Sequence, residues 1–361
     1  MVQDPLLGWL AEVTRPHRRL GVALATALMT LSLVGLFAVA PPIAAIWWFA
    51  LCLTGLFSAY SFLTICFYAE GVTKAAALGP GGHLRLAGWR EAGSLLGVCL
   101  AAVAPVALLA LTDRPFAGFA VFFAALALAA TLAMHREWQG SPNAMTDSVF
   151  ALFRPVFADP LARRLLLIAL LNGAPVAVTS TLFLFFVESR LKLPGQEGPL
   201  LLLFFLAAAL STPGWSLLAR RHGARRVLLA AMALSIVAFL WTVTLGAGDG
   251  FAFALVCAAS GAALGADMTL LPAIFAERLA RIDARAAAAF GLWNFVAKLS
   301  LAVAAATVLP ALDLAGFRPG EENSAFALNT LTLIYAAVPC VLKIAAIVLL
   351  AFTSIPEPEK R

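Results

Sequence analysis

The sequence predicts an all-α integral membrane protein with ten transmembrane helices. Hydrophobic residues make up 62% of the 361 residues and charged residues only 12%, whereas soluble domains carry roughly 25% charged residues. The apolar residues form long runs between short charged turns, and each run reaches the roughly 20 residues that a helix needs to cross a bilayer. A β-barrel would instead show alternating strands of about ten residues.

A repeated motif predicts that the chain consists of two related parts. Gly-Trp at residues 8 and 9 recurs at residues 214 and 215, and Arg-Arg at residues 18 and 19 recurs at residues 225 and 226. A repeat over such a distance indicates a duplicated structural unit. Four apolar runs follow each copy, but two more precede the second copy and almost nothing precedes the first. We therefore expect four plus six helices, a six plus six design that lacks its first two.

The first part, residues 1–134, is predicted to be an incomplete N-terminal bundle of four helices that follow a basic inner turn. These helices are expected over residues 20–40, 46–68, 92–111 and 116–134. Pro41 and Pro42 end the first of them, because proline cannot continue a helix. Glycine and proline residues predict a longer, irregular inner turn from Glu70 to Arg90.

Residues 135–164 form the predicted central cytoplasmic connection, which has the only sustained polar composition in the chain. Five of its apolar residues are spaced like one face of a helix: Val149, Phe150, Phe153, Val156 and Phe157. This pattern is typical of a short helix on the inner membrane surface, and a loop packed against the bundle is the alternative.

Residues 165–361 are predicted to form a C-terminal bundle of six helices. These are expected over residues 165–187, 199–219, 227–246, 251–275, 288–310 and 326–353. Two six-helix bundles joined by a long inner loop are typical of secondary transporters, in which the bundles rock about a site near the midplane of the membrane.

The basic residues predict how the chain is oriented. Most Lys and Arg residues lie in the predicted inner turns, and the outer side holds only Arg114, Arg190, Lys192 and Arg318. By the positive-inside rule, we expect a multi-pass protein of the cell (inner) membrane with both termini in the cytoplasm. The net charge of +6 therefore reflects topology, and no nucleic-acid partner is expected.

The sequence offers no pattern for a metal site or for enzymatic catalysis. The five cysteines lie within apolar runs without a CxxC pair, and the four histidines lie far apart in turns. No GxxxxGK[ST] motif for nucleotide binding is present, and no nucleophile stands beside a base. We predict neither an enzyme nor an ATP-driven pump.

Several motifs occur in a fixed order along nearly the whole chain. They are DPLLG at residues 4–8, Arg85 with AGWREAGSLLG at 87–97, DPLAR at 159–163, GAD at 265–267 with Pro272, AE at 276–277, FG at 290–291, and Lys298. Together they resemble the melibiose-carrier-like family of glycoside-pentoside-hexuronide:cation symporters, which is part of the major facilitator superfamily. This resemblance implies a major facilitator-type bundle and symport of a sugar or glycoside with Na⁺ or H⁺.

The chain departs from the pattern of that family in three places. It starts after the family's first helix and most of the second, so an acidic residue one turn before Asp4 is absent. Glu277 stands where the family has Asp, and the turn after it lacks the usual Thr-Gly. The segment ICFYAE at residues 65–70 replaces a proline-aromatic pattern and offers no buried Asp.

Two charged residues inside apolar runs are candidates for the substrate or coupling site. Lys298 is expected about 15 Å into its helix, near the middle of a roughly 30 Å bilayer core, where an ionisable residue indicates function. Its alternative role is a structural charge pair. Asp267 is expected either to pair with Lys298 or to hydrogen-bond to helix ends. Lys343, closer to the inner surface, is expected to snorkel toward water.

Other candidates are uncharged or lie near helix ends. Tyr68 and Trp293 can stack on a sugar ring, although aromatic residues are also common at bilayer interfaces. Asn172 can bind a hydroxyl or bridge two helices. The resemblance alone implies that Asp4 is a cation ligand, and a frayed, solvated residue is the alternative. Candidates for an inner gate, with plain structural placement as the alternative, are Glu70, Arg90 and Glu277.

The sequence thus predicts a secondary active transporter that works by alternating access. Its expected partners are a small-molecule sugar or glycoside and the lipid bilayer, with Na⁺ or H⁺ as coupling ion. No cofactor and no obligate protein partner are expected. Two alternatives stay open: a major facilitator transporter of lipid or drug-like cargo, and a truncated, non-transporting paralogue or the product of a mis-started gene.

Overall fold

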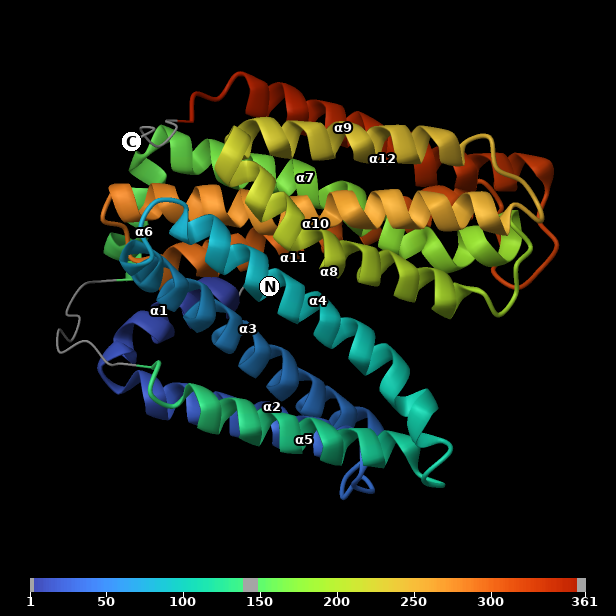
Figure 1. The fold of residues 1–361 in the computed structure, drawn as a ribbon. Helices are drawn as coiled ribbons and strands as arrows, with labels where there is room; N and C mark the ends of the chain where they lie inside the picture. Colours follow the sequence, from blue (N-terminus) through green and yellow to red (C-terminus); the bar gives the residue numbers. More distant parts are fainter. Residues whose placement is uncertain (1–2, 139–148, 356–361) are drawn as a thin grey trace. The chain divides into compact units, whose positions relative to one another are not determined.

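A computed structural model describes residues 3–138 and 149–355 of the chain (Figure 1). Within these ranges it is all-helical, and ten helices are long and apolar enough to cross a membrane. They are α2 (Arg18–Phe37), α3 (Ala45–Ala77), α4 (Gly82–Leu108), α5 (Pro115–Met134), α7 (Pro160–Phe185), α8 (Glu197–His222), α9 (Ala224–Thr242), α10 (Gly250–Arg281), α11 (Ala286–Leu314) and α12 (Ala325–Ala351). The predicted all-α class and ten spans are confirmed.

Four shorter elements accompany the spans. They are α1 (Gln3–Val13), the 3-10 helix η1 (Arg15–His17), α6 (Val149–Ala158) and the π-helical turn η2 (Phe186–Arg190). The predicted helix in the central connection therefore exists as α6, and its position at the membrane surface stays a prediction. Residues 139–148 of that connection and the terminal residues 356–361 lie outside the described part of the chain.

The predicted turn from Glu70 to Arg90 is wrong, because most of it is helical. Helix α3 continues to Ala77 and α4 already begins at Gly82. The chain reverses at Gly79 and Gly81, whose φ angles of 71° and 77° favour glycine because it has no Cβ. The 33 residues of α3 extend over about 50 Å, which exceeds the roughly 30 Å thickness of a bilayer core. The end of α3 can therefore lie outside the core, where polar residues are tolerated within the helix.

The chain divides into two compact units. Unit 1 comprises Met1–Lys74, Leu100–Ala158 and Leu279–Phe295, and unit 2 comprises Ala75–Cys99, Asp159–Arg278 and Val296–Arg361. The predicted division at residues 134 and 165 stays a prediction.

Unit 1 packs its helices around small and apolar residues. One of its core clusters consists of Ala11, Val22, Ala25, Phe62, Ile65, Cys66, Ala69, Trp138 and Ala287. Helix α2 runs along α5, as Figure 1 also shows. Helix α1 approaches α11 closely, because a Cβ built on Gly8 would lie 2.8 Å from the Ala287 carbonyl oxygen and 3.1 Å from Gly291 Cα. Glycine at these two positions therefore lets the two backbones meet.

Unit 2 contains a larger apolar core in which aromatic rings stack. Helix α12 packs along both α7 and α9 (Figure 1). Phe186 of η2, directly after α7, stacks on Tyr335 of α12: the two rings are parallel within 9°, with centroids 4.3 Å apart. Phe253 of α10 packs beside Phe186 at a centroid distance of 5.4 Å. These buried rings hold η2, α10 and α12 together, and helices α7, α10 and α12 carry the polar cluster described next.

Candidate functional site

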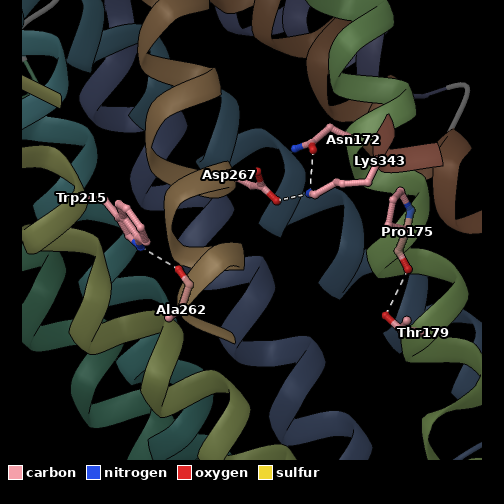
Figure 2. Close-up of polar contacts among 7 residues, drawn as sticks. All are labelled: Asn172, Pro175, Thr179, Trp215, Ala262, Asp267 and Lys343. Carbon is pink, nitrogen blue, oxygen red and sulfur yellow. Dashed lines mark hydrogen bonds and ion pairs between the residues drawn. The ribbon is translucent and has the colours of Figure 1, made fainter. Parts of the chain in front are cut away.

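Three polar side chains meet inside unit 2, each from a different helix (Figure 2). The Lys343 ammonium on α12 donates to Asn172 Oδ1 on α7 over 2.7 Å and forms an ion pair with Asp267 Oδ2 on α10. The residues are 2%, 4% and 7% exposed, respectively. At roughly 1.5 Å per residue, each lies more than about 10 Å from the nearer end of its helix. The cluster is thus an ion pair in the interior of the bundle.

Burial makes this ion pair costly for the fold. An ionised group inside the bilayer loses its hydration, and attraction to the opposite charge repays this loss only where hydrogen bonds complete the arrangement. Asn172 supplies one such bond to the ammonium. Asp267 Oδ1, however, is buried without a hydrogen-bond partner among the described residues. The ammonium thus has two acceptors, whereas one oxygen of the carboxylate lacks a partner in the described part of the chain.

A small cavity lies beside the ion pair. The centre of a water-sized sphere can move within a volume of about 10 Å³ in this cavity. The cavity therefore has room for roughly one particle the size of a water molecule. Asp267 and Lys343 line it together with three hydroxyl residues, which are Thr179, Ser235 and Ser260. The apolar part of the wall comes from Pro175, Val176, Phe204, Phe239 and Leu264.

Two of the hydroxyl groups already donate their protons to backbone carbonyl groups of their own helices. Thr179 Oγ1 donates to Pro175 O over 3.1 Å (Figure 2), and Ser260 Oγ donates to Val256 O over 2.7 Å. A hydroxyl oxygen that donates its proton in this way still has lone pairs with which to accept. The residues that line the cavity thus include hydroxyl groups that can accept and a carboxylate with one oxygen unpartnered among the described residues.

The structure corrects the expectation for Lys343. Its side chain does not snorkel to water but points into the bundle, where Asp267 and Asn172 compensate its charge. The sequence left two alternatives for Asp267, a pair with Lys298 or hydrogen bonds to helix ends, whereas the structure pairs Asp267 with Lys343. Lys298 is half-buried on α11. A polar residue in each of three apolar runs was the only sequence signal that could have indicated this cluster.

The aromatic candidates lie together in unit 1. The ring of Tyr68 on α3 lies 4.7 Å from that of Phe290 on α11, measured between centroids. Trp293, one turn further along α11, meets Phe290 edge-on at 6.5 Å. Asp4 lies on α1 with an exposure of 0%, so it is neither frayed nor solvated. The roles proposed for Tyr68, Trp293 and Asp4 stay predictions.

The gate candidates lie on separate stretches of helix. Glu70 is half-buried on α3. Arg90 Nε donates to the neighbouring Glu91 carboxylate over 2.8 Å on α4. Glu277 is half-buried near the end of α10. Their role in a gate also stays a prediction.

Beside Glu277, an ion pair that the sequence did not indicate joins α7 to α10. Asp159 caps α7 by accepting from Ala162 N over 2.7 Å, and Arg278 Nε donates to the same carboxylate over 3.0 Å. The Arg278 guanidinium, followed by the Ala162 amide, holds the pKa of Asp159 below its ordinary value. The motif DPLAR thus starts α7 and binds it to the end of α10.

Glu12 is a second buried carboxylate, in unit 1. It is 3% exposed, and its Oε1 accepts a hydrogen bond of 2.9 Å from Ala287 N in the first turn of α11. The free N–H groups and the dipole at a helix N-terminus stabilise a negative charge there. Because the contact joins residues 275 positions apart, sequence spacing could not reveal it.

Comparison with known proteins places this geometry in a wider context. Residues 1–357 match the model of a family described as MFS/sugar transport protein. The search among curated protein sequences found no match.

Solved structures share the fold at low sequence identity. The human organic anion transporter TETRAN is similar with a TM-score of 0.69 and 17% identity, over 96% of this chain and 80% of that one. A bacterial homologue of the iron transporter ferroportin has a TM-score of 0.67 and 16% identity, over 96% and 86% of the two chains. The fucose:proton symporter of E. coli has a TM-score of 0.67 and 15% identity, over 98% and 88%. These likenesses establish the fold alone.

Proposed function

Because the chain belongs to the MFS/sugar transport protein family of the major facilitator superfamily, we propose that it is a sugar or glycoside symporter driven by Na⁺ or H⁺. Transport would proceed by alternating access, as in other two-bundle transporters. The order of motifs from DPLLG to Lys298 supports a place among the glycoside-pentoside-hexuronide:cation symporters. We also propose an inner-membrane location with both termini in the cytoplasm, on the basis of the positive-inside rule.

The buried ion pair of Asp267 and Lys343 carries the proposal that transport is coupled to a cation. The two residues are 7% and 2% exposed and lie inside apolar helices. Charged residues within membrane spans are costly and typically mark ion or substrate pathways. If a bound cation replaces the Lys343 ammonium at the Asp267 carboxylate, the cation-loaded and the cation-free protein differ in free energy. Such a difference can shift the equilibrium between the conformations of the transporter. Lys298 and Asp4 are further candidates for this coupling.

The aromatic rings of unit 1 support a sugar as cargo. Tyr68 and Trp293 flank Phe290, and aromatic faces pack well against the C–H faces of sugar rings. We propose that Tyr68 and Trp293 contact the ring of the substrate. Glu70, Arg90 and Glu277 would then serve the inner gate.

Uptake into proteoliposomes tests the proposed function. Purified protein is reconstituted, a Na⁺ or H⁺ gradient is imposed, and a panel of labelled glycosides is followed against protein-free liposomes. We expect one glycoside class to accumulate above equilibrium until an ionophore collapses the gradient. Movement of labelled lipid without any uptake of glycosides would instead favour the lipid-cargo alternative.

Substitutions of the aromatic residues test the sugar contact. Tyr68→Ala and Trp293→Ala are expected to raise KM for the sugar about tenfold each, because a stacking partner is lost. Trp47→Ala, at a site on α3 that is 69% exposed, is the matched control and should leave KM unchanged. Equal KM values in all three variants would remove these rings from the substrate site.

A further inference from the structure

We propose that the cavity beside Asp267 is a binding site for one alkali cation, Na⁺ or Li⁺, and that Lys343 is a tethered competitor for the same carboxylate. The inference deepens the proposed function and rests on it, because it assigns the coupling ion and its place in unit 2. No other role in the proposed transport cycle has used this cavity.

The first observation is the unsatisfied carboxylate. Asp267 is 7% exposed and lines the cavity, its Oδ2 is held by Lys343, and its Oδ1 has no hydrogen-bond partner among the described residues. A buried charged oxygen without a donor or cation is strongly unfavourable. The geometry therefore calls for a small donor or cation at Oδ1.

The second observation is the size and lining of the cavity. About 10 Å³ takes roughly one water-sized particle, so a dehydrated alkali ion fits and an organic cation does not. Carboxylate and hydroxyl oxygens are hard ligands, which suit hard cations. The hydroxyl groups of Thr179 and Ser260 donate away to carbonyl oxygens, so their lone pairs are available to a cation. Asp267 Oδ1 would supply the negative charge.

The third observation is the positive charge that already occupies the carboxylate. The ammonium of Lys343 repels any second cation near Asp267, and this repulsion is strong because both residues are buried. Native affinity for the alkali ion is therefore kept low. When the cation binds, the link between α10 and α12 through Oδ2 weakens, while Asn172 Oδ1 still accepts from the ammonium. The cation thereby changes how these two helices are held together.

The experiment measures cation binding directly, without transport. Full-length purified protein in detergent is titrated with NaCl or LiCl against choline chloride at equal ionic strength and fixed pH. Binding of ²²Na⁺ and the cation-dependent rise in Tm are recorded, since a ligand of the folded state stabilises it. We expect weak binding in the native protein, none in Asp267→Asn, and about tenfold or more tighter binding in Lys343→Met, which lacks the repelling charge.

Matched variants control for general effects. Lys192→Met removes an exposed lysine, and Asp313→Asn removes an exposed carboxylate that pairs with Arg318, so both should bind Na⁺ as the native protein does. If the single variants at Asp267 or Lys343 fold poorly, the double variant D267N/K343M restores neutrality and should show no cation effect. A native protein that responds equally to NaCl and choline chloride, or a D267N variant that still responds to NaCl, overturns the proposal.

The two proposals fail in distinguishable ways. Cation binding at Asp267 without gradient-driven uptake of any glycoside leaves the site intact and removes the proposed function. Gradient-driven uptake that persists in D267N leaves symport intact and removes Asp267 as the site of the coupling ion.

Discussion

Two buried carboxylates, Glu12 in unit 1 and Asp267 in unit 2, are stabilised in different ways. Glu12 accepts from a backbone N–H in the first turn of α11, where the helix has free donors. Asp267 lies in the middle of α10, where backbone N–H groups are engaged within the helix, so it needs a cationic side chain. A backbone dipole is fixed, whereas a side-chain cation can be exchanged. This difference makes Asp267 the better candidate for a switch.

The largest expected change in stability comes from a substitution that breaks the ion pair of unit 2. Lys343→Ala leaves the Asp267 carboxylate buried without its countercharge and should lower the free energy of unfolding by about 3–5 kcal/mol. The double variant D267A/K343A should recover much of this loss, because no charge remains buried. Denaturant titrations in mild detergent measure both. Strictly additive losses would mean that the two residues are not coupled.

The next effect distinguishes the two copies of the repeated Gly-Trp motif. Gly8→Ala places a Cβ 2.8 Å from the backbone of Ala287, so α1 and α11 must move apart at a cost of about 1–3 kcal/mol. At Gly214 a Cβ meets nothing within 4 Å, and Gly214→Ala should be neutral or stabilise α8 by about 0.5–1 kcal/mol. Thermal unfolding compares the two variants. Equal changes would show that the copies pack alike.

A smaller effect tests the helix-terminal carboxylate of unit 1. Glu12→Ala removes the acceptor of Ala287 N and should cost about 1–2 kcal/mol. Glu12→Gln keeps an oxygen acceptor but no charge, and should lose only the smaller interaction with the dipole of α11. Unfolding measurements on both variants separate hydrogen bond from charge. A Gln variant as unstable as the Ala variant would contradict this division.

The smallest effect concerns Asp159, at the start of α7. The pKa of Asp159 in the folded protein lies below its ordinary value. Its contribution to the free energy of unfolding is therefore fully present above the unfolded pKa of about 4, and it is lost as the pH falls through the lower folded pKa. The contribution should be about 1 kcal/mol or less. Arg278→Gln should reduce this part of the acid dependence, as Tm measurements between about pH 5 and pH 3 would show. An unchanged acid profile in Arg278→Gln would exclude the ion pair as its source.

Several features of the fold could be predicted from local sequence. The ten spans follow from the lengths of apolar runs, and the helix start at Asp159 follows from a capping side chain before proline. The sequence predicts too long a turn between α3 and α4, because its glycine and proline residues indicate irregular backbone from Glu70 to Arg90, whereas only residues 78–81 separate the two helices. Helix ends depend on glycine conformation at Gly79 and Gly81 more than on polarity.

The sequence by itself determined the ten helices of the described residues that are long and apolar enough to cross a membrane, and it determined membership of the major facilitator superfamily, because run length and motif order are properties of the chain alone. Only the tertiary structure decided that Asp267 pairs with Lys343 and that Glu12 meets the first turn of α11. Lys298 and Lys343 both lie in helices apolar enough to cross a membrane, and expected depth alone did not identify which of them pairs with Asp267. The choice depends on which faces of α7, α10 and α12 pack together, and packing over such separations is a property of the folded bundle.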